Sequence, residues 1–409
     1  LIFIPLFSRA VENVEALYVV FPISLLVFVI INYGSFRLSS FWDLAKSFIP
    51  FLIWVSVSNL WSDFPFTSFT RSLYLIFILI GVALLSIKVN SNVLVEVLTE
   101  QFYIILAFAS VALLFDIPGD GWTGGNAKGF KGVFLHQNTL GMLLFISSAF
   151  FALKLLKSHK TGAPFLKEIL PLLLLNGGSI FLLILTFSRA SILSYFVFII
   201  LFILFSYGFK KVFKLILGIT GVLLIIFLLD NTLINYLLFK GDDSVLSSRS
   251  TLYLSSIEAA KSGGLVGLGF GVSDQNIKEE APGKMADGIF IREKGSTILA
   301  LVEETGLVGL ILFYLPVYII LYSIYRKHKT HRHSNSEINS IPRDILESNN
   351  SRDPQQQILL NFLIALLIAM IFHSQFEAWG VGVGSVTLPI YILVQFLLLK
   401  IILHSKTKV

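Results

Sequence analysis

The sequence predicts an all-α protein, a polytopic membrane helix bundle of about eleven or twelve transmembrane helices. Of its 409 residues, 55% are hydrophobic and only 14% are charged, and the mean hydropathy is +0.82. Soluble domains carry about a quarter charged residues. Apolar stretches of about 20 residues, enough helix to cross a hydrocarbon core, recur along the chain. Their Val, Ile, Leu and Phe residues lack the alternation of a transmembrane β-strand, which argues against an outer-membrane barrel.

We expect eleven spans, the second of them short, near residues 14–31, 47–60, 72–87, 93–115, 138–156, 169–187, 190–207, 215–230, 298–325, 358–376 and 384–403. No cleavable signal peptide is visible. Because the chain opens on LIFIPLF without a methionine, we expect that a further N-terminal span is trimmed or incomplete, which would raise the total to twelve.

The positive charges indicate which helix ends face the cytoplasm. If the spans alternate in direction, one face receives more than half of the 31 Lys and Arg residues. They lie in the loops with Arg37 and Lys46, Lys88, KSHKTGAPFLK, KKVFK, RKHKTHRH and the KTK tail. Short cytoplasmic loops carry such an excess. The net charge of +6 therefore reflects topology and not the binding of nucleic acid.

This topology divides the chain into five parts. They are an N-terminal transmembrane bundle (1–230), a large periplasmic loop (231–297), a transmembrane helix (298–325), a flexible cytoplasmic linker (326–357) and C-terminal transmembrane helices (358–409). The linker is polar and rich in Ser and Asn. Its three histidines lie among Lys and Arg residues, so we expect no metal site there, and a chain without cysteine has no thiolate ligand.

One arginine lies in the most apolar part of the chain. In TFSRASILSYF, Arg189 is the only formal charge between Glu168 and Lys210. Since about 20 apolar residues flank it on each side, we expect a helical hairpin with Arg189 in its tight outer turn, where the guanidinium reaches water or lies between helices. Arg189 either anchors the turn at the lipid headgroups or has a functional role. The positive-inside tendency disfavours a mere anchor on the outer face.

A second outer arginine, Arg249, opens an amphipathic stretch of the large loop, and GGLVGLGFG follows. These glycines let the backbone turn tightly or approach a ligand closely, but they lack the strand-turn-helix context of a nucleotide-binding fingerprint. Arg249 is either an ordinary loop charge or the functional partner of Arg189. Two guanidiniums on one membrane face match phosphate oxygens, so the pair indicates a phosphate-bearing ligand.

Charged residues cluster where the next span begins, in REKGSTILALVEETGLVGL. Arg292, Glu293 and Lys294 precede the span, and Glu303 and Glu304 lie within its first turns. A carboxylate inside an apolar span is costly unless it faces a partner or a cavity. Glu304 is therefore either a ligand-binding residue or part of an ion pair that fixes helix packing. The small residues of TGLVGL allow close packing of helices.

Two further segments bring titratable groups to the outer face. GVFLHQNTLG places His136 and Asn138 at the start of a span. His136 can exchange a proton near neutral pH, and Asn138 is suited to cap the helix. HSQFEAWG places Glu377 at the outer end of another span, where Trp379 is expected as an interfacial anchor. We expect the polar side chains of both segments to line one cavity together with Lys294 and Glu304.

Together these motifs resemble the O-antigen ligase/polymerase family. Its members share the order GxFxHxN, TxSR at a hairpin, an arginine that opens the large periplasmic loop ahead of GxGxG, and ExG leading into a span. The corresponding segments here are GVFLHQN, TFSR, SSRS with GLGFG, and EETG, within roughly residues 130–315. The resemblance implies a GT-C-like membrane glycosyltransferase that needs no metal or other cofactor and works at the periplasmic face of a bacterial inner membrane.

The resemblance also implies partners and roles. The donor would be a glycan on polyprenyl pyrophosphate, and by motif match Arg189 and Arg249 would bind its pyrophosphate. Fixed cations can stabilise such a leaving group as its charge develops. The acceptor would be a glycan or lipid-glycan, and membrane lipids and other envelope polysaccharide-assembly proteins would be further partners.

One departure from the family bears on the reaction. Its ligases carry a His-Asn pair about ten residues before the glycine of ExG, as the proposed base, and this chain has Gly295 and Ser296 there. We therefore expect Glu293 to accept the proton of the acceptor hydroxyl, in a polysaccharide polymerase more than in a lipid A core ligase. A transporter or flippase of lipid-linked oligosaccharide, and an interaction partner in an envelope complex, are the alternatives that the motifs leave open.

Overall fold

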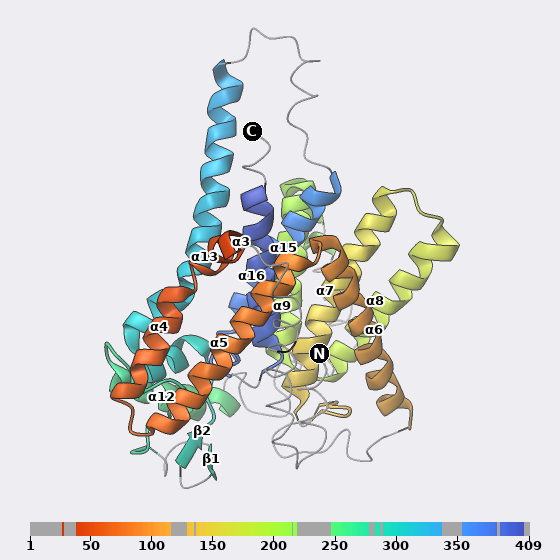
Figure 1. The fold of residues 1–409 in the computed structure, drawn as a ribbon. Coiled ribbons are helices and arrows are strands. Elements are labelled where there is room, and N and C mark those ends of the chain that lie inside the picture. Colours follow the sequence, from red (N-terminus) through yellow and green to blue (C-terminus); the bar gives the residue numbers. More distant parts are fainter. Residues whose placement is uncertain are drawn as a thin grey trace.

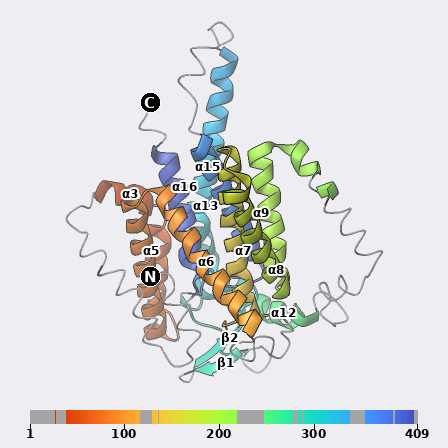
Figure 2. The same ribbon diagram turned by 90° about the vertical axis from the view of Figure 1, so that its right-hand side faces the viewer.

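The computed structural model describes residues 27, 38–115, 129–134, 136–214, 216–218, 247–277, 283–286, 289–337, 354–382 and 385–404. In this part of the chain a bundle of helices carries a small two-stranded sheet at one end (Figures 1 and 2). Among the described residues, seven helices are long and apolar enough to cross a membrane, and two shorter apolar helices are Ile49–Leu60 and Thr387–Leu403. The predicted α-helical polytopic membrane protein is confirmed. Two predicted spans, 14–31 and 215–230, lie almost entirely outside the described residues.

The elements follow the predicted spans closely. In chain order they are α3 (Leu38–Ala45), α4 (Ile49–Val57), η2 (Ser58–Leu60), α5 (Pro65–Lys88), α6 (Ser91–Phe115), α7 (Gln137–Lys160), the π-helical turn η3 (Phe165–Ile169), α8 (Leu170–Leu185), α9 (Arg189–Tyr207), α12 (Ser247–Gly263), β1 (Gly283–Ala286), β2 (Ile289–Arg292), α13 (Thr297–Glu337), α15 (Pro354–His373) and α16 (Thr387–His404). Proline lies in the first turn of α4, α5 and α8, where its missing N–H costs no helical hydrogen bond. The strands β1 and β2 pair antiparallel.

The helices α7, α15 and α16 form the centre of the bundle (Figure 1). In the most apolar window of α7, 78% of the residues are buried, against 22% in α8, so α8 lies at the edge. Phe362 of α15 packs edge-on against Phe150 of α7 and Phe198 of α9. Aromatic pairs in this geometry add to the contact area that holds the three helices together.

The two ends of the bundle differ in charge. At one end, which we call the basic end, Lys400 Nζ donates to the carbonyl oxygens of Ser86 and Val89 at 2.7 and 2.9 Å, and Lys157 Nζ donates to Asn92 Oδ1 at 3.2 Å. These residues lie at or near helix ends that the charge pattern groups on one face. At the opposite end, which we call the sheet end, lie α12, β1 and β2, all within the predicted loop 231–297 (Figure 1).

The helices α8 and α9 form a hairpin whose turn is Thr186–Ser188, at the sheet end. Phe187 has φ 48°, which is uncommon for a residue with a side chain. The backbone N–H of Ser188 donates to Thr186 Oγ1 at 3.1 Å, which stabilises the turn. The predicted hairpin is present, but Arg189 is the first residue of α9 and directly follows the turn in which it was expected.

The helix α13 continues beyond the predicted end of its span. A flexible linker was expected over residues 326–357, but α13 runs as helix to Glu337 and α15 begins at Pro354. Lys and Arg are good helix formers, and a helix that its apolar part already stabilises needs no new nucleus to continue. Residues 326–337 and 354–357 of the predicted linker are therefore helical, while residues 338–353 lie outside the described part.

Candidate active site

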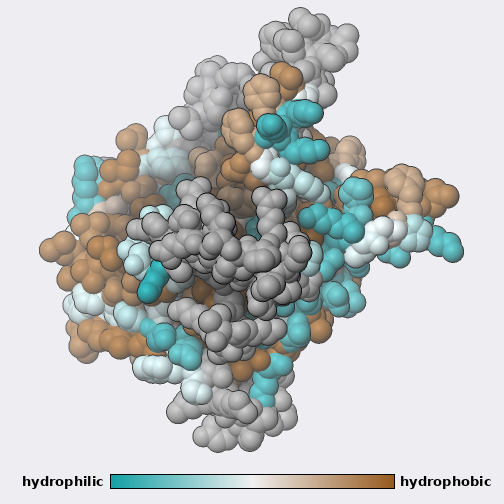
Figure 3. Space-filling view, turned by 90° about the horizontal axis from the view of Figure 1, so that it is seen from above, coloured by the Kyte–Doolittle hydropathy of each residue, from teal (hydrophilic) through white to brown (hydrophobic). Residues whose placement is uncertain are grey.

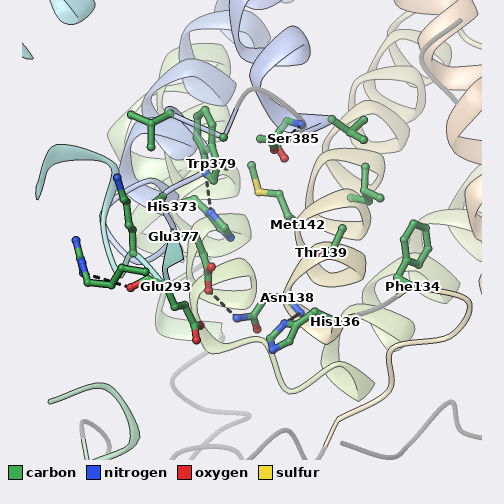
Figure 4. A pocket seen from close by; sticks show the side chains of 18 of the residues that line it. Phe134, His136, Asn138, Thr139, Met142, Glu293, His373, Glu377, Trp379 and Ser385 are labelled. Carbon is green, nitrogen blue, oxygen red and sulfur yellow. Dashed lines mark hydrogen bonds between the residues drawn. The ribbon is translucent and has the colours of Figure 1, made fainter. Parts of the chain in front are cut away.

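A cavity of about 400 Å³ lies at the sheet end. Its wall combines the start of α7, the end of α15, the segment between α15 and α16, and the chain between β2 and α13 (Figure 4). The size falls in the range of small-molecule sites. Six of the eight residues predicted for the site line it, namely His136, Asn138, Glu293, Lys294, Glu304 and Glu377. The fold thus brings motifs that are far apart in the sequence to one space.

His136, and not Asn138, caps α7. His136 Nδ1 accepts a hydrogen bond from the backbone N–H of Asn138 at 3.1 Å. The capping role predicted for Asn138 is therefore wrong. Its side-chain Nδ2 instead donates to Glu377 Oε1 at 2.6 Å, which ties α7 to the segment that follows α15 (Figure 4). Hydrogen bonds to a carboxylate are stronger than neutral ones, so this contact fixes one side of the cavity.

The HQNTLG and TFSR motifs touch each other. A Cβ on Gly141 of α7 would lie 2.6 Å from the Cβ of Ser188, so only glycine allows this approach. A Cβ on Gly129 would lie 2.1 Å from the carbonyl oxygen of Thr186. The backbone N–H of Phe130 donates to the carbonyl of Leu185 at 2.9 Å. The turn that bears Arg189 is therefore packed directly against the segment that leads into α7.

His373, at the end of α15, links this turn to the cavity. Its Nδ1 accepts from Trp379 Nε1 at 3.1 Å, and its Nε2 lies 3.0 Å from Ser191 Oγ. Because an indole N–H only donates, the neutral imidazole carries its proton on Nε2 and donates to Ser191. Ser191 Oγ lies 2.9 Å from Ser188 Oγ. Trp379 is buried, so its predicted role as an interfacial anchor is wrong.

Sequence reasoning did not select His373 for the site, although it lines the cavity and is 1% exposed. The available signal was an imidazole placed directly after an apolar span, in the HSQFEAWG segment. Only the fold shows that this imidazole faces inward to α9.

Arg292, Lys294 and Glu304 lie on the opposite wall, and Glu303 forms ion pairs with the two cations. Arg292 Nη2 lies 2.5 Å from Glu303 Oε2, and both side chains are fully buried. Lys294 Nζ pairs with Glu304 and lies 3.3 Å from Glu303 Oε2. Glu304 was expected either to bind a ligand or to form an ion pair. It forms the ion pair with Lys294, and it also lines the cavity.

The glycine-rich loop packs against a break in α13. At Gly306 the backbone leaves the helix, with φ 70° and ψ −177°. The carbonyl oxygens of Glu303 and Glu304 accept from the N–H groups of Leu268 and Gly269 at 2.9 and 3.0 Å. A Cβ on Gly306 would lie 2.1 Å from the carbonyl oxygen of Leu265. Irregular backbone within a span requires such internal partners. In GGLVGLGFG, Gly263 and Gly267 therefore allow the loop to approach the broken helix closely, since their Cβ atoms would lie 2.1 and 2.3 Å from carbonyl oxygens of α13.

The same loop also holds the carboxylates. The N–H of Gly271 donates to Glu304 Oε2 at 2.7 Å, and the N–H of Asp274 donates to Glu303 Oε1 at 3.0 Å. Arg71 of α5 donates through Nη1 to the carbonyl oxygen of Gly271 at 2.6 Å and lines the cavity. Arg71 was not selected from the sequence. It precedes the predicted span 72–87 at its outer end, so the charge rule that singled out Arg189 would have found it.

The two arginines predicted to bind pyrophosphate begin helices at the sheet end. Arg189 is partly exposed and is not among the described residues that line the cavity. It lies between Ser188 and Ser191, which connect to His373. Arg249 lies in the first turn of α12, and its side chain is outside the described part. One turn later, Tyr253 Oη donates to the carbonyl oxygen of Gln375 at 2.7 Å, close to Glu377.

Several groups that attract negative charge reach the cavity. The helices α7 and α16 both begin at the wall, through Thr139 and Thr387, and helix N-termini attract negative charge. Arg71 and Lys294 add cations to the lining, beside the carboxylates of Glu293, Glu304 and Glu377. Within the described residues there is no group of three or more His, Asp and Glu side chains that could hold a metal ion.

These elements define a polytopic membrane protein with a charged cavity at one end of its helices. Residues 174–314 match the model of a family described as O-antigen ligase, so this region of the chain is similar to that family. The matched region contains Arg189, Arg249 and the segment with Lys294 and Glu304, but neither the start of α7 nor Glu377. No curated protein matches the chain.

Proposed function

We propose that the protein is a surface-polysaccharide polymerase of the O-antigen ligase type. It transfers a glycan from a polyprenyl-pyrophosphate carrier to a glycan or lipid-glycan acceptor, at the periplasmic face of a bacterial inner membrane. The observation that carries this proposal is the cavity at the sheet end, where residues of separate family motifs meet. The family match supports the reaction type, and the charge pattern of the loops supports the orientation.

Glu293 is the proposed base. It is exposed and lines the cavity, whereas Glu304 is paired with Lys294 and Glu377 accepts from Asn138. In an inverting transfer the acceptor oxygen attacks the anomeric carbon as Glu293 takes its proton. The bond from that carbon to the pyrophosphate breaks, and the pyrophosphate leaves with the electron pair. A positioned base of this kind contributes roughly a hundredfold or more.

The pyrophosphate is the group that the cations hold in this proposal. Arg189 and Arg249 begin α9 and α12 at the sheet end, and Arg71 and Lys294 lie on the cavity wall. Guanidinium groups bind phosphate oxygens with two parallel hydrogen bonds. Fixed cations stabilise charge that develops on the leaving group without moving during the reaction.

The polymerase assignment is supported at the position where ligases have their base. Gly295 and Ser296 are both buried, and a Cβ on Gly295 would lie 3.1 Å from Leu252 Cγ. A side chain there would press against Leu252 of α12. A different proton acceptor is therefore needed, and Glu293 is two residues away.

The test uses the purified full chain in lipid vesicles with polyprenyl-pyrophosphate-linked repeat units. Wild type is expected to produce longer glycans, and Glu293→Gln is expected to lose at least a hundredfold in rate. Glu258→Gln, at an exposed carboxylate of α12, is the matched control. Arg189→Ala is expected to insert normally and make no polymer. Wild-type chain length in Arg189→Ala, or a Glu293→Gln rate within a few fold of wild type, would refute the respective role.

The broken helix α13 is the observation that favours a transporter, because transporters bind substrate at breaks in their helices. Here the carbonyl oxygens at the break accept from the chain's own Leu268 and Gly269, and no second helix break of this kind occurs among the described elements. The vesicle assay separates the two functions, since a transporter moves the lipid-linked glycan without lengthening it.

A further inference from the structure

A second cavity, of about 450 Å³, lies between α7, α8 and α9. The helix α8 packs closely along α7 but makes few contacts with α9. The two helices of the hairpin therefore diverge with distance from their turn, at the edge of the bundle (Figure 1). We call the cavity between them the wedge. Apart from His159, Asn176 and Tyr207, every residue on its wall is apolar, namely Ala152, Leu155, Leu156, Phe165, Ile169, Leu173, Ile199, Phe202 and Ile203.

This cavity lies far from the candidate active site. Its wall on α9 runs from Ile199 to Tyr207, about 12 Å along the helix axis. Arg189 begins the same helix at the sheet end, so Tyr207 is roughly 27 Å away from it. The pyrophosphate of a donor bound at the sheet end cannot occupy this position. A ligand here must come from the leaflet at the basic end.

The mouth of the cavity is basic. His159 lines it, and Lys160 Nζ lies 5.5 Å from the centre of the Tyr207 ring. Lys167 lies in the turn η3, between two residues of the wall. Lys160 and Lys167 are exposed, and neither forms an ion pair with another described residue. Figure 3 looks onto this end and shows hydrophilic side chains among apolar ones.

We propose that this wedge binds an anionic glycerophospholipid of the adjacent leaflet. One acyl chain lies between α8 and α9, and the phosphate contacts Lys160, Lys167 and His159. An apolar cleft alone would accept any lipid tail. The lysines at its mouth select the anionic headgroup, because basic residues near a lipid surface attract negative lipids.

The bound lipid fills space that protein contacts leave open. Since α8 is the most exposed side of the hairpin that carries Arg189, the acyl chain joins α8 to α9 where direct contacts are few. The lipid thereby stabilises the hairpin from its open end, without taking part in the chemistry at the sheet end.

The experiment is native mass spectrometry of the full chain in detergent, with dioleoyl phosphatidylglycerol, dioleoyl phosphatidylcholine and a polyprenyl phosphate as probes. Wild type is expected to retain phosphatidylglycerol in preference to phosphatidylcholine. Ile203→Trp, which fills the wedge, is expected to lose this adduct. Leu193→Trp, at an exposed position of the same helix outside the wall, is expected to keep it.

A second variant, which changes only the charge at the mouth, tests the proposal even if Ile203→Trp does not fold. Lys160→Gln with Lys167→Gln should lower the preference for phosphatidylglycerol roughly fivefold per residue. Lys46→Gln with Lys154→Gln changes the same charge at the basic end without touching the wedge and should change little. Equal retention of both phospholipids by wild type, an unchanged preference in the Lys160 and Lys167 variant, or displacement of phosphatidylglycerol by polyprenyl phosphate would overturn the proposal.

Discussion

Replacing Arg292 with Met should destabilise the protein more than the loss of any surface ion pair. The Arg292 and Glu303 side chains are fully buried, with Nη2 and Oε2 2.5 Å apart. Breaking a buried pair by removing one partner costs roughly 3–5 kcal/mol, because a buried charge loses its compensation. Lys294 Nζ lies 3.3 Å from the same carboxylate, and Asp274 N–H donates to it at 3.0 Å. We therefore expect the lower end, a loss of about 3 kcal/mol in the free energy of unfolding.

A double-mutant cycle in detergent, with unfolding followed by denaturant titration, measures this. Arg292→Met with Glu303→Leu leaves no unpaired charge between them, so the double variant should be more stable than the sum of the two single losses by about 2 kcal/mol. Lys46→Met is the control, because Lys46 and Asp43 form a pair that is 54% and 55% exposed, worth about 0–1 kcal/mol. If Arg292→Met matches that control, or the two losses simply add, the assignment of this pair as an anchor of the cavity wall is refuted.

Three other substitutions probe the same end of the bundle. Gly306→Ala, at φ 70° with its Cβ 2.1 Å from a carbonyl oxygen, should lose about 3 kcal/mol of stability. Gly178→Ala, in the interior of α8 with open space around it, should keep or slightly raise the melting temperature, because alanine favours a helix over glycine. Asn138→Asp places a second carboxylate against Glu377 and should shorten the glycan product more than Asn138→Ala does, and equal products would contradict the contact. His373→Leu leaves the buried Trp379 Nε1 without its acceptor and should cost about 1–3 kcal/mol, and a wild-type unfolding curve would show that the hydrogen bonds of His373 contribute nothing.

Alternation of spans predicted which motifs share a face. Each span reverses the direction of the chain, so the number of spans between two motifs determines whether they meet. His136, Lys294 and Glu377 come from segments separated by an even number of crossings, and the structure places all three on one cavity. The prediction required only span lengths and charges, which are local properties of the sequence.

The contacts within that end could not be predicted in the same way. The helix α7 is apolar on all sides, so no hydrophobic stripe indicates which face is inward. That Asn138 bonds Glu377, that His136 caps α7, and that His373 turns toward Ser191 all depend on how the helices rotate against one another. The break in α13 at Gly306 could not be predicted from the sequence either, because a glycine in an apolar run also suits close packing of intact helices.

The sequence by itself determined that this is a membrane protein, where most of its spans run, and which charged motifs share an end, because hydrophobic length and charge count act locally and add along the chain. The tertiary structure decided which carboxylates are neutralised, leaving Glu293 as the exposed one on the cavity wall. It also decided that a wedge opens between α8 and α9. Ion pairs and cavities depend on distances between segments remote in sequence, and only the packed bundle sets those distances.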